Sequence, residues 1–244
     1  MKRMMQGMIV ALGALHGMAH AGTVVAPPGL GVAAGNGSFS TSPFNATDSS
    51  TRIQQLFSST MFSSLSGPVQ ITGIAFRPKT AGAGFTFPHV QVDLSTIAAT
   101  SLSSTFASNV GANDTVDFNG VLTLPAVASA PVPGSVGQFQ VSIPFTTPFV
   151  YNPAAGNLVV DIRVFTVSGG TYLIDAQGQA TGTLVFSEQS ANGGDVNSLT
   201  GVVQNGVAVT EFTFAALSAV PEPGTMGLFG GALFALRLLR RRGV

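Results

Sequence analysis

Hydrophobic and polar residues alternate along much of this chain with the two-residue period of β-strands. Val, Ile and Phe are common at the hydrophobic positions, and Gly, Asn, Pro and Ser separate the alternating segments, as turns require. No helical pattern lies between these segments. The alternation predicts about eight strands, at residues 69–76, 90–94, 116–124, 138–145, 157–167, 172–176, 182–188 and 207–217.

Strands at this spacing predict an all-β body at residues 51–219, folded as an antiparallel β-sandwich or a jelly-roll-like structure. Residues 52–64 depart from the alternation, because their apolar side chains recur at helical spacing. These side chains are Ile53, Leu56, Phe57 and Met61. The β-branched and hydroxyl residues of the segment disfavour a long helix, so we expect at most a short one there.

Residues 22–50 form a lead before this body, rich in Gly, Ala, Ser and Pro and weakly patterned. The lead is either flexible or contains an irregular first strand. The best candidates for that strand are the neighbourhoods of Phe39 and Phe44. The sequence leaves both interpretations open.

The first 21 residues have the three parts of a secretory signal peptide. Lys2 and Arg3 give a basic start, residues 8–15 are apolar, and Ala19 and Ala21 supply the small residues of a cleavage site. We therefore predict a signal-peptide helix at residues 1–21. The secretory translocon would read it and signal peptidase would remove it, leaving Gly22 as the first mature residue.

The C-terminal end carries a second apolar segment followed by basic residues. Residues 225–239 are predicted to form a transmembrane helix, with Arg237 near its end and a cytoplasmic stop in the cluster Arg240, Arg241 and Arg242. Residues 224–239 would span roughly 24 Å as a helix, less than the roughly 30 Å hydrocarbon core, so the bilayer would thin locally. Basic residues at both ends place the body outside the inner membrane.

The tail resembles a PEP-CTERM sorting signal, with Val220-Pro221-Glu222-Pro223-Gly224, an apolar span and a terminal arginine cluster in that order. Gly224 stands where the family often has Ser. The resemblance implies that the tail is a substrate of exosortase, a transpeptidase-like membrane protease of Gram-negative bacteria that make extracellular polysaccharide. It also implies that Pro221, Glu222 and Pro223 are recognition residues. An ordinary tail anchor with a Pro-rich stalk is the alternative.

Proline chemistry suits such a recognition segment. Pro221 and Pro223 keep residues 220–224 out of the helix and extended, in a form that a protease can grip, with Glu222 as its only charge. The body shows a further resemblance, over residues 52–175, to a recurring extracellular β domain found in front of PEP-CTERM tails. That resemblance implies no known catalytic activity or ligand.

Charge and cysteine content exclude several classes of function. Without both ends the lead and the body together, residues 22–219, keep four basic residues and nine acidic residues, a formal charge of −5. The basic residues are Arg52, Arg77, Lys79 and Arg163. Four scattered cations cannot neutralise a run of phosphates, so nucleic acid is excluded as a partner. The chain has no cysteine, which excludes disulfides, thiolate metal sites and a cysteine nucleophile.

The residues that enzymes use are sparse in the body. His89 is the only histidine outside the signal peptide, and no nucleophile motif surrounds it, so we expect a histidine at the surface or at a strand edge. Glu188 and Glu211 are candidates for a pair of glycosidase carboxylates. The chain has no Trp and only Tyr151 and Tyr172 to stack sugar rings. We therefore predict that the protein is not an enzyme.

Two oxygen-rich segments, residues 113–117 and 192–198, are candidates for calcium ligands. Neither matches the twelve-residue calcium loop, and Asx residues commonly stabilise turns. We predict turns and no cofactor, with calcium as the alternative.

Charged residues within the predicted strands are expected to pair. Asp161 and Arg163 lie two residues apart and so share one face of a strand, which favours a local or cross-strand ion pair. Arg77 ends a strand and is expected to close a turn by donating to backbone carbonyls.

The sequence thus predicts an inner-membrane-anchored precursor that becomes a structural protein of the cell surface or biofilm matrix of a Gram-negative bacterium. Its partners would be signal peptidase, the translocon, exosortase and, transiently, the inner membrane, with extracellular polysaccharide as a further candidate. The alternative is a carbohydrate-binding or adhesive β-sandwich at the same location.

Overall fold

The computed structural model describes residues 22–39, 44, 50–128, 136–165, 173–178, 186–191 and 195–217. Within them the 3-10 turns are η1 (Ser59–Phe62), η2 (Phe106–Asn109) and η3 (Pro153–Ala155). The strands are β1 (Gly22–Ala26), β2 (Gly37–Phe39), β3 (Thr51–Phe57), β4 (Val69–Phe76), β5 (Phe85–Ile97), β6 (Thr115–Leu124), β7 (Val141–Tyr151), β8 (Asn157–Val164), β9 (Ile174–Gly178), β10 (Phe186–Ala191), β11 (Gly201–Gln204), β12 (Gly206–Ala208) and β13 (Thr210–Ala216). The predicted all-β class is confirmed.

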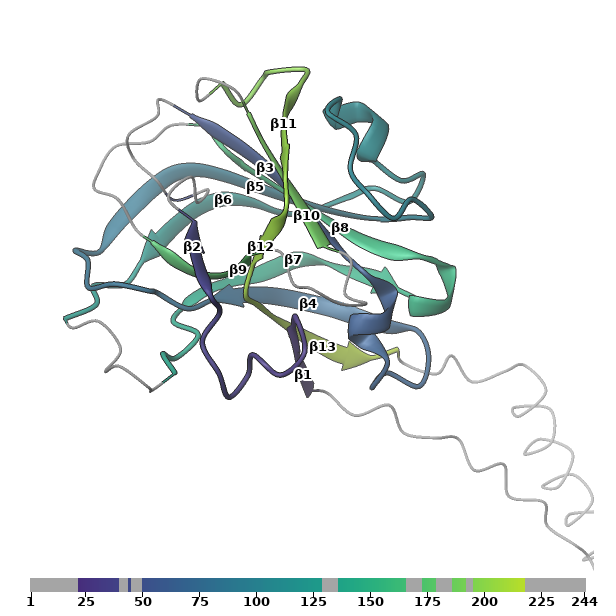
Figure 1. Cartoon of the computed structure of the whole chain (residues 1–244), viewed down its shortest axis with the longest axis horizontal. Coiled ribbons are helices and arrows are strands. Elements are labelled where there is room, and N and C mark those ends of the chain that lie inside the picture. The colour runs from purple at the N-terminus through teal and green to yellow at the C-terminus, as the bar shows by residue number, and fades with distance from the viewer. Residues whose placement is uncertain are drawn as a thin grey trace, which may run out of the picture.

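The strands form two packed layers and a small third sheet (Figure 1). One layer is a four-stranded sheet in the order β1-β13-β4-β7, and the other is a six-stranded sheet in the order β11-β10-β3-β8-β5-β6. Strands β12, β9 and β2 make the third sheet. The strand pairs are antiparallel throughout the described residues, so the prediction of an antiparallel β-sandwich is confirmed.

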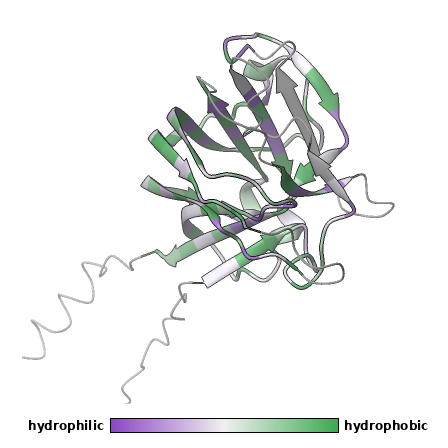
Figure 2. Ribbon diagram, turned by 90° about the vertical axis from the view of Figure 1, so that its left-hand side faces the viewer, coloured by the Kyte–Doolittle hydropathy of each residue, from purple (hydrophilic) through white to green (hydrophobic). Residues whose placement is uncertain are grey.

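The hydrophobic core lies between the two layers. Alternate residues of a strand point to opposite faces, and the inward residues of β8 are all buried, namely Leu158, Val160, Ile162 and Val164. Phe212 of the four-stranded sheet meets Phe57 of the six-stranded sheet edge to face, with ring centroids 5.1 Å apart. Figure 2 shows hydrophobic and hydrophilic residues alternating along the strands. The two-residue alternation of hydrophobic and polar residues in the sequence therefore corresponds to alternating buried and exposed side chains along the strands.

The predicted strands match the observed ones most closely where the alternation is regular. The strand predicted at 69–76 has the bounds of β4, and the strand predicted at 116–124 lies within β6. The prediction at 90–94 covers only part of β5, and the segment at 207–217 divides into β12 and β13. Four short or irregular strands, β1, β2, β3 and β11, were not among the eight.

Residues 52–64 contain a strand where the spacing suggested a short helix. Strand β3 occupies most of the segment, between β10 and β8, and only the 3-10 turn η1 follows it. Leu56 lies on the outer face of the sheet yet is fully buried, because it packs with Leu102 and Val159. Apolar side chains on both faces of one strand imitate helical spacing, so β3 was not predicted, whereas the expectation of at most a short helix agrees with η1.

The lead at residues 22–50 contributes strands to the fold. β1 pairs with β13 along its whole length, and β2 pairs with β9. Phe44 is fully buried in the core, where it contacts Phe76. Within the described residues, no helix has the length and apolar character needed to cross a membrane. The signal peptide predicted at 1–21 and the helix predicted at 225–239 lie outside those residues.

Candidate functional site

Both ends of the described body lie side by side. Gly22, the first residue of β1, is opposite Phe214 of β13 in the antiparallel register, and β13 ends at Ala216. In Figure 1, β1 and the end of β13 lie next to each other at one extremity of the sandwich. The segments that precede and follow the body therefore leave it at nearly the same point.

The predicted sorting and cleavage residues lie outside the described part of the chain. They are Ala19, Ala21, Pro221, Glu222, Pro223, Arg240, Arg241 and Arg242. The sequence nevertheless limits their distance from the body. Ala21 adjoins Gly22, and Pro221 follows Ala216 by five residues, which span at most about 18 Å.

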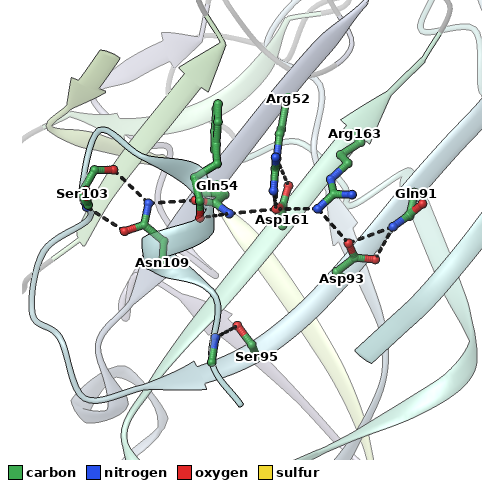
Figure 3. Close-up of polar contacts among 11 residues, drawn as sticks. Arg52, Gln54, Gln91, Asp93, Ser95, Ser103, Asn109, Asp161 and Arg163 are labelled. Carbon is green, nitrogen blue, oxygen red and sulfur yellow. Dashed lines mark hydrogen bonds and ion pairs between the residues drawn. The ribbon is translucent and has the colours of Figure 1, made fainter. Parts of the chain in front are cut away.

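A polar network covers part of the outer face of the six-stranded sheet (Figure 3). The register places Gln54 of β3, Asp161 of β8 and Asp93 of β5 in one row across three neighbouring strands. The next row contains Arg52, Arg163 and Gln91. Sheet pairing thus brings together polar residues that are far apart in the sequence.

Asp161 is the centre of this network. Arg52 forms a two-pronged ion pair with it, Nη2 to Oδ2 at 2.6 Å and Nε to Oδ1 at 3.1 Å. Gln54 Nε2 donates to the same Oδ2 at 2.8 Å. Arg163 Nη2 lies 3.4 Å from Asp161 Oδ2, which confirms the predicted pairing of these two residues. The cross-strand partner Arg52 holds Asp161 more closely than Arg163 does.

Asp93 continues the network toward the far side of the sheet. Arg163 Nη2 lies 3.4 Å from Asp93 Oδ2, and Gln91 Nε2 donates to both carboxylate oxygens at 2.9 Å. Burial raises the pKa of Asp93 to about 6, against the opposing effects of the Gln91 hydrogen bond and the Arg163 charge. The carboxyl group of Asp93 therefore changes charge near neutral pH.

The loop between β5 and β6, residues 98–114, covers one end of the network. Asn109 Nδ2 donates to Gln54 Oε1 at 2.9 Å, and Gln54 Nε2 donates to the carbonyl of Phe106 at 3.2 Å. The Phe106 ring lies against the Arg52 guanidinium, with 4.4 Å from Cζ to the ring centroid. These contacts join the loop to β3, and they leave little of Arg52 open to solvent.

The other end of the outer face is more open. His89 stacks on Phe165 with the ring centroids 4.1 Å apart and nearly parallel, and His89 Nε2 lies 2.8 Å from Asn119 Oδ1. Asn119 is exposed, and Arg163 and Gln91 are half-buried in the adjoining row. We call Gln91, His89, Asn119, Arg163 and Phe165 the open patch. It combines a flat pair of rings with amide and guanidinium donors.

Asp117 is a buried carboxyl group at an irregular point of the β5–β6 pairing. The register shifts there, and the backbone N–H of Leu94 donates to Asp117 Oδ2 at 2.9 Å. The other oxygen, Oδ1, is buried without a hydrogen-bond partner. Burial is the largest cause that raises the pKa of Asp117, to about 8. The group is therefore mostly protonated at neutral pH.

A second buried ionic cluster fastens the lead to the sandwich. Arg77 Nε donates to Asp175 Oδ2 at 2.7 Å, and its terminal nitrogens donate to the carbonyls of Leu30 and Ala33 at 2.7 and 2.6 Å. Arg77 was expected to close a turn by donating to backbone carbonyls; it does donate to carbonyls, but they belong to the lead, more than 40 residues away in the sequence. Gly35 N–H also donates to Asp175, and these donors hold the pKa of that carboxyl below its usual value despite burial. Pattern analysis missed Asp175, because its partner lies 98 residues away.

In the two oxygen-rich segments, for which turns were predicted and calcium was the alternative, side-chain oxygens of described residues accept internal hydrogen bonds. Asn113 Oδ1 accepts from Thr96 N–H at 2.8 Å, and Asp195 Oδ1 accepts from Asn197 N–H at 2.9 Å. Residues 192–194 lie outside the described chain. In the described portion, no group of three or more His, Cys, Asp or Glu residues is placed to hold a metal ion.

The residues considered for catalysis are dispersed. Tyr151 is buried and donates its hydroxyl to the Gly156 carbonyl at 3.1 Å, and burial raises its pKa. Glu211 lies on β13, in the four-stranded sheet, whereas Glu188 lies on β10 in the six-stranded sheet. Tyr172 is outside the described residues. The two candidate glycosidase carboxylates therefore belong to different sheets.

Comparison with known proteins identifies the tail. Residues 219–242 match the PEP-CTERM protein-sorting motif. The motif implies an exported, membrane-anchored precursor with an exosortase as its processing partner. No curated protein and no solved structure matches the chain.

Proposed function

We propose that this PEP-CTERM protein is a structural protein of the cell surface or biofilm matrix of a Gram-negative bacterium. In this proposal the chain is exported, is held by its tail, and is processed by exosortase at or near Pro221, Glu222 and Pro223. The β-sandwich then remains outside the cell as a component of the surface or matrix.

The observation that carries this proposal is the position of the two ends of the body. Gly22 and Phe214 are cross-strand neighbours, so the chain enters and leaves the body at one extremity. Cuts before Gly22 and within the sorting motif would therefore leave the described strands intact. The remaining surface of the sandwich, including both broad sheet faces, stays free of these processing steps.

The use of charged residues within the body also supports a structural role. Asp161 and Asp175 are almost fully buried, and each forms an ion pair with an arginine from a distant part of the chain. His89 contacts Asn119 and Phe165, and these contacts provide neither a carboxylate orienter nor a hydroxyl nucleophile. We therefore propose, in addition, that the protein is not an enzyme.

Expression of the full chain in a polysaccharide-producing bacterium with an active exosortase tests this proposal. Intact-mass spectrometry of the matrix fraction is expected to find a chain that begins at Gly22 and lacks the residues after about Val220. The Glu222→Ala variant should keep its tail and stay with the membrane, whereas the matched Glu211→Ala variant on β13 should be processed normally. Processed protein that is entirely free in the medium would contradict a structural role in the matrix.

The open patch favours carbohydrate binding as a second candidate function. Sugars are bound by flat rings combined with planar hydrogen-bonding groups, and the patch offers the His89–Phe165 pair beside Gln91, Asn119 and Arg163. A glycan array probed with the processed protein tests this candidate. Binding should be lost in Phe165→Ala and retained in Leu199→Ala, whose side chain is exposed outside the patch. Equal binding by both variants would exclude the open patch as the carbohydrate-binding site.

A further inference from the structure

An apolar groove of about 420 Å³ lies beside β1, the edge strand of the four-stranded sheet. Val24, Val25, Pro28, Val32 and Met61 provide its apolar lining, with glycine and hydroxyl residues between them. None of the described residues that line it is charged. The groove therefore offers apolar surface without the ions that usually protect an edge strand.

The loop after β1 folds back along the strand and forms one wall of this groove. A methyl group placed on Gly31 would lie 3.7 Å from Val25 Cγ2, which shows how closely the loop follows β1. Val32, the next residue, is 88% exposed. Val32 thus adds an exposed apolar side chain to the uncharged lining of the groove.

The groove lies near the point where the chain leaves the body. Val25 is three residues from Gly22, about 10 Å along the strand, and Gly22 is opposite Phe214. Seven residues, 218–224, connect Leu217 to residue 225, where the predicted apolar span begins, and the connection reaches at most about 28 Å. In the anchored precursor, this short connection keeps the groove close to the bilayer.

We propose that the groove beside β1 rests on the outer surface of the inner membrane while the tail is uncut, with lipid acyl chains as its occupant. This inference depends on the membrane-anchored precursor of the proposed function. The body then lies with its β1 side toward the lipid, and the β11 side of the sandwich points away. Cleavage of the tail removes the tether, and the body leaves the surface.

Lipid fits the chemistry of the groove better than a charged partner does. Burial of apolar side chains at the boundary of headgroups and acyl chains needs no basic residue. The charged residue nearest in the register is Glu211, opposite Val25 on β13. Contact with the membrane should therefore be insensitive to salt, and anionic lipid should not strengthen it.

The absence of native cysteine allows a direct test with single reporters. The full chain is produced in cells without exosortase, with Ser64→Cys at the groove or Leu199→Cys at the exposed segment before β11. Each cysteine is labelled with an environment-sensitive fluorophore, and the protein is reconstituted into phosphatidylcholine vesicles. Flotation measures anchoring, and quenching by nitroxide lipids measures contact. The Val32→Asp substitution is then added to the Ser64→Cys protein.

The inference predicts that emission from the Ser64→Cys label moves to shorter wavelength and is quenched by the nitroxide lipids. The Leu199→Cys label should remain in water, and Val32→Asp should return the groove label to water without changing flotation. If the protein floats with the vesicles but the label on Ser64→Cys remains in water, the inference is overturned. The anchored precursor would then still stand. A protein that does not float would overturn the anchored precursor itself. A wavelength shift without lipid that grows with protein concentration would identify a second copy as the occupant, and this too would overturn the inference.

Discussion

The pairing of β5 with β6 places a carboxyl group where its ionised form is costly, and the Asp117→Asn substitution tests this directly. Asp117 is fully buried, and only its Oδ2 has a hydrogen-bond partner, the N–H of Leu94. Asparagine has nearly the same shape, and its carbonyl oxygen can accept the Leu94 bond. It has no proton to lose. The substitution therefore removes the titration while keeping the packing.

The magnitude follows from the difference between two pKa values. Burial raises the pKa of Asp117 from 3.8 to about 8. Between these values the folded protein holds a proton that the unfolded chain has released, so the free energy of unfolding falls as pH rises. The slope is about 1.4 kcal/mol per pH unit, and the full difference corresponds to at most about 6 kcal/mol. Above about pH 8 the stability that the protonated Asp117 contributes is fully lost.

Urea denaturation followed by circular dichroism measures this effect. The interval from about pH 7 to about pH 8 isolates Asp117, because Asp93, with a pKa of about 6, is already mostly ionised there. We expect wild-type stability to decrease across the interval, and Asp117→Asn to be more stable at pH 8 and less dependent on pH. Asp195→Asn, an exposed site with the same change of charge, is the control. Equal pH dependence in wild type and Asp117→Asn would refute the reasoning.

Three further predictions concern the contacts that hold the sandwich together. Arg77→Met leaves the buried Asp175 carboxylate without its closest cation and should cost about 3–5 kcal/mol in urea denaturation at neutral pH, and less once acid protonates Asp175. Gln54→Leu removes one of the acceptors of Asn109 Nδ2, so hydrogen exchange in residues 98–114 should become faster at a cost of about 1–3 kcal/mol. Phe212→Ala empties a site between the sheets and should lower the unfolding free energy by about 3–5 kcal/mol, as measured by urea denaturation. A loss below about 1 kcal/mol for Phe212→Ala would contradict its central position in the core.

The local alternation of hydrophobic and polar residues was sufficient to predict a strand where the strand has one buried and one solvated face. Residues 69–76 alternate regularly, and the predicted bounds coincide with β4. Strand β3 was not predicted, because the 98–114 loop covers Leu56 on the outer face. An apolar residue therefore stands where the alternation would require a polar one. Strands β1 and β2 contain few residues and are stabilised by partners more than a hundred residues away. No local signal marks such strands.

The same distinction applies to the candidate sites. The two-residue spacing of Asp161 and Arg163 was enough to predict that they share a face and form an ion pair. The closer partner Arg52 depends on the register of β3 against β8, which spacing within one strand does not reveal. The open patch likewise requires three strands to be aligned. The sorting motif is different, because residues 219–242 match it through their sequence alone.

The pairing of β1 with β13 also has a consequence for the order of events during export. The first described strand finds its partner only in the last, so the four-stranded sheet cannot close until nearly all of the body has crossed the membrane. Contacts between such distant segments form slowly, because a long loop must close before they gain any stability. The chain is therefore expected to remain incompletely folded, and so able to cross the membrane, until β13 has been exported. Completion of the fold then coincides with arrival of the tail.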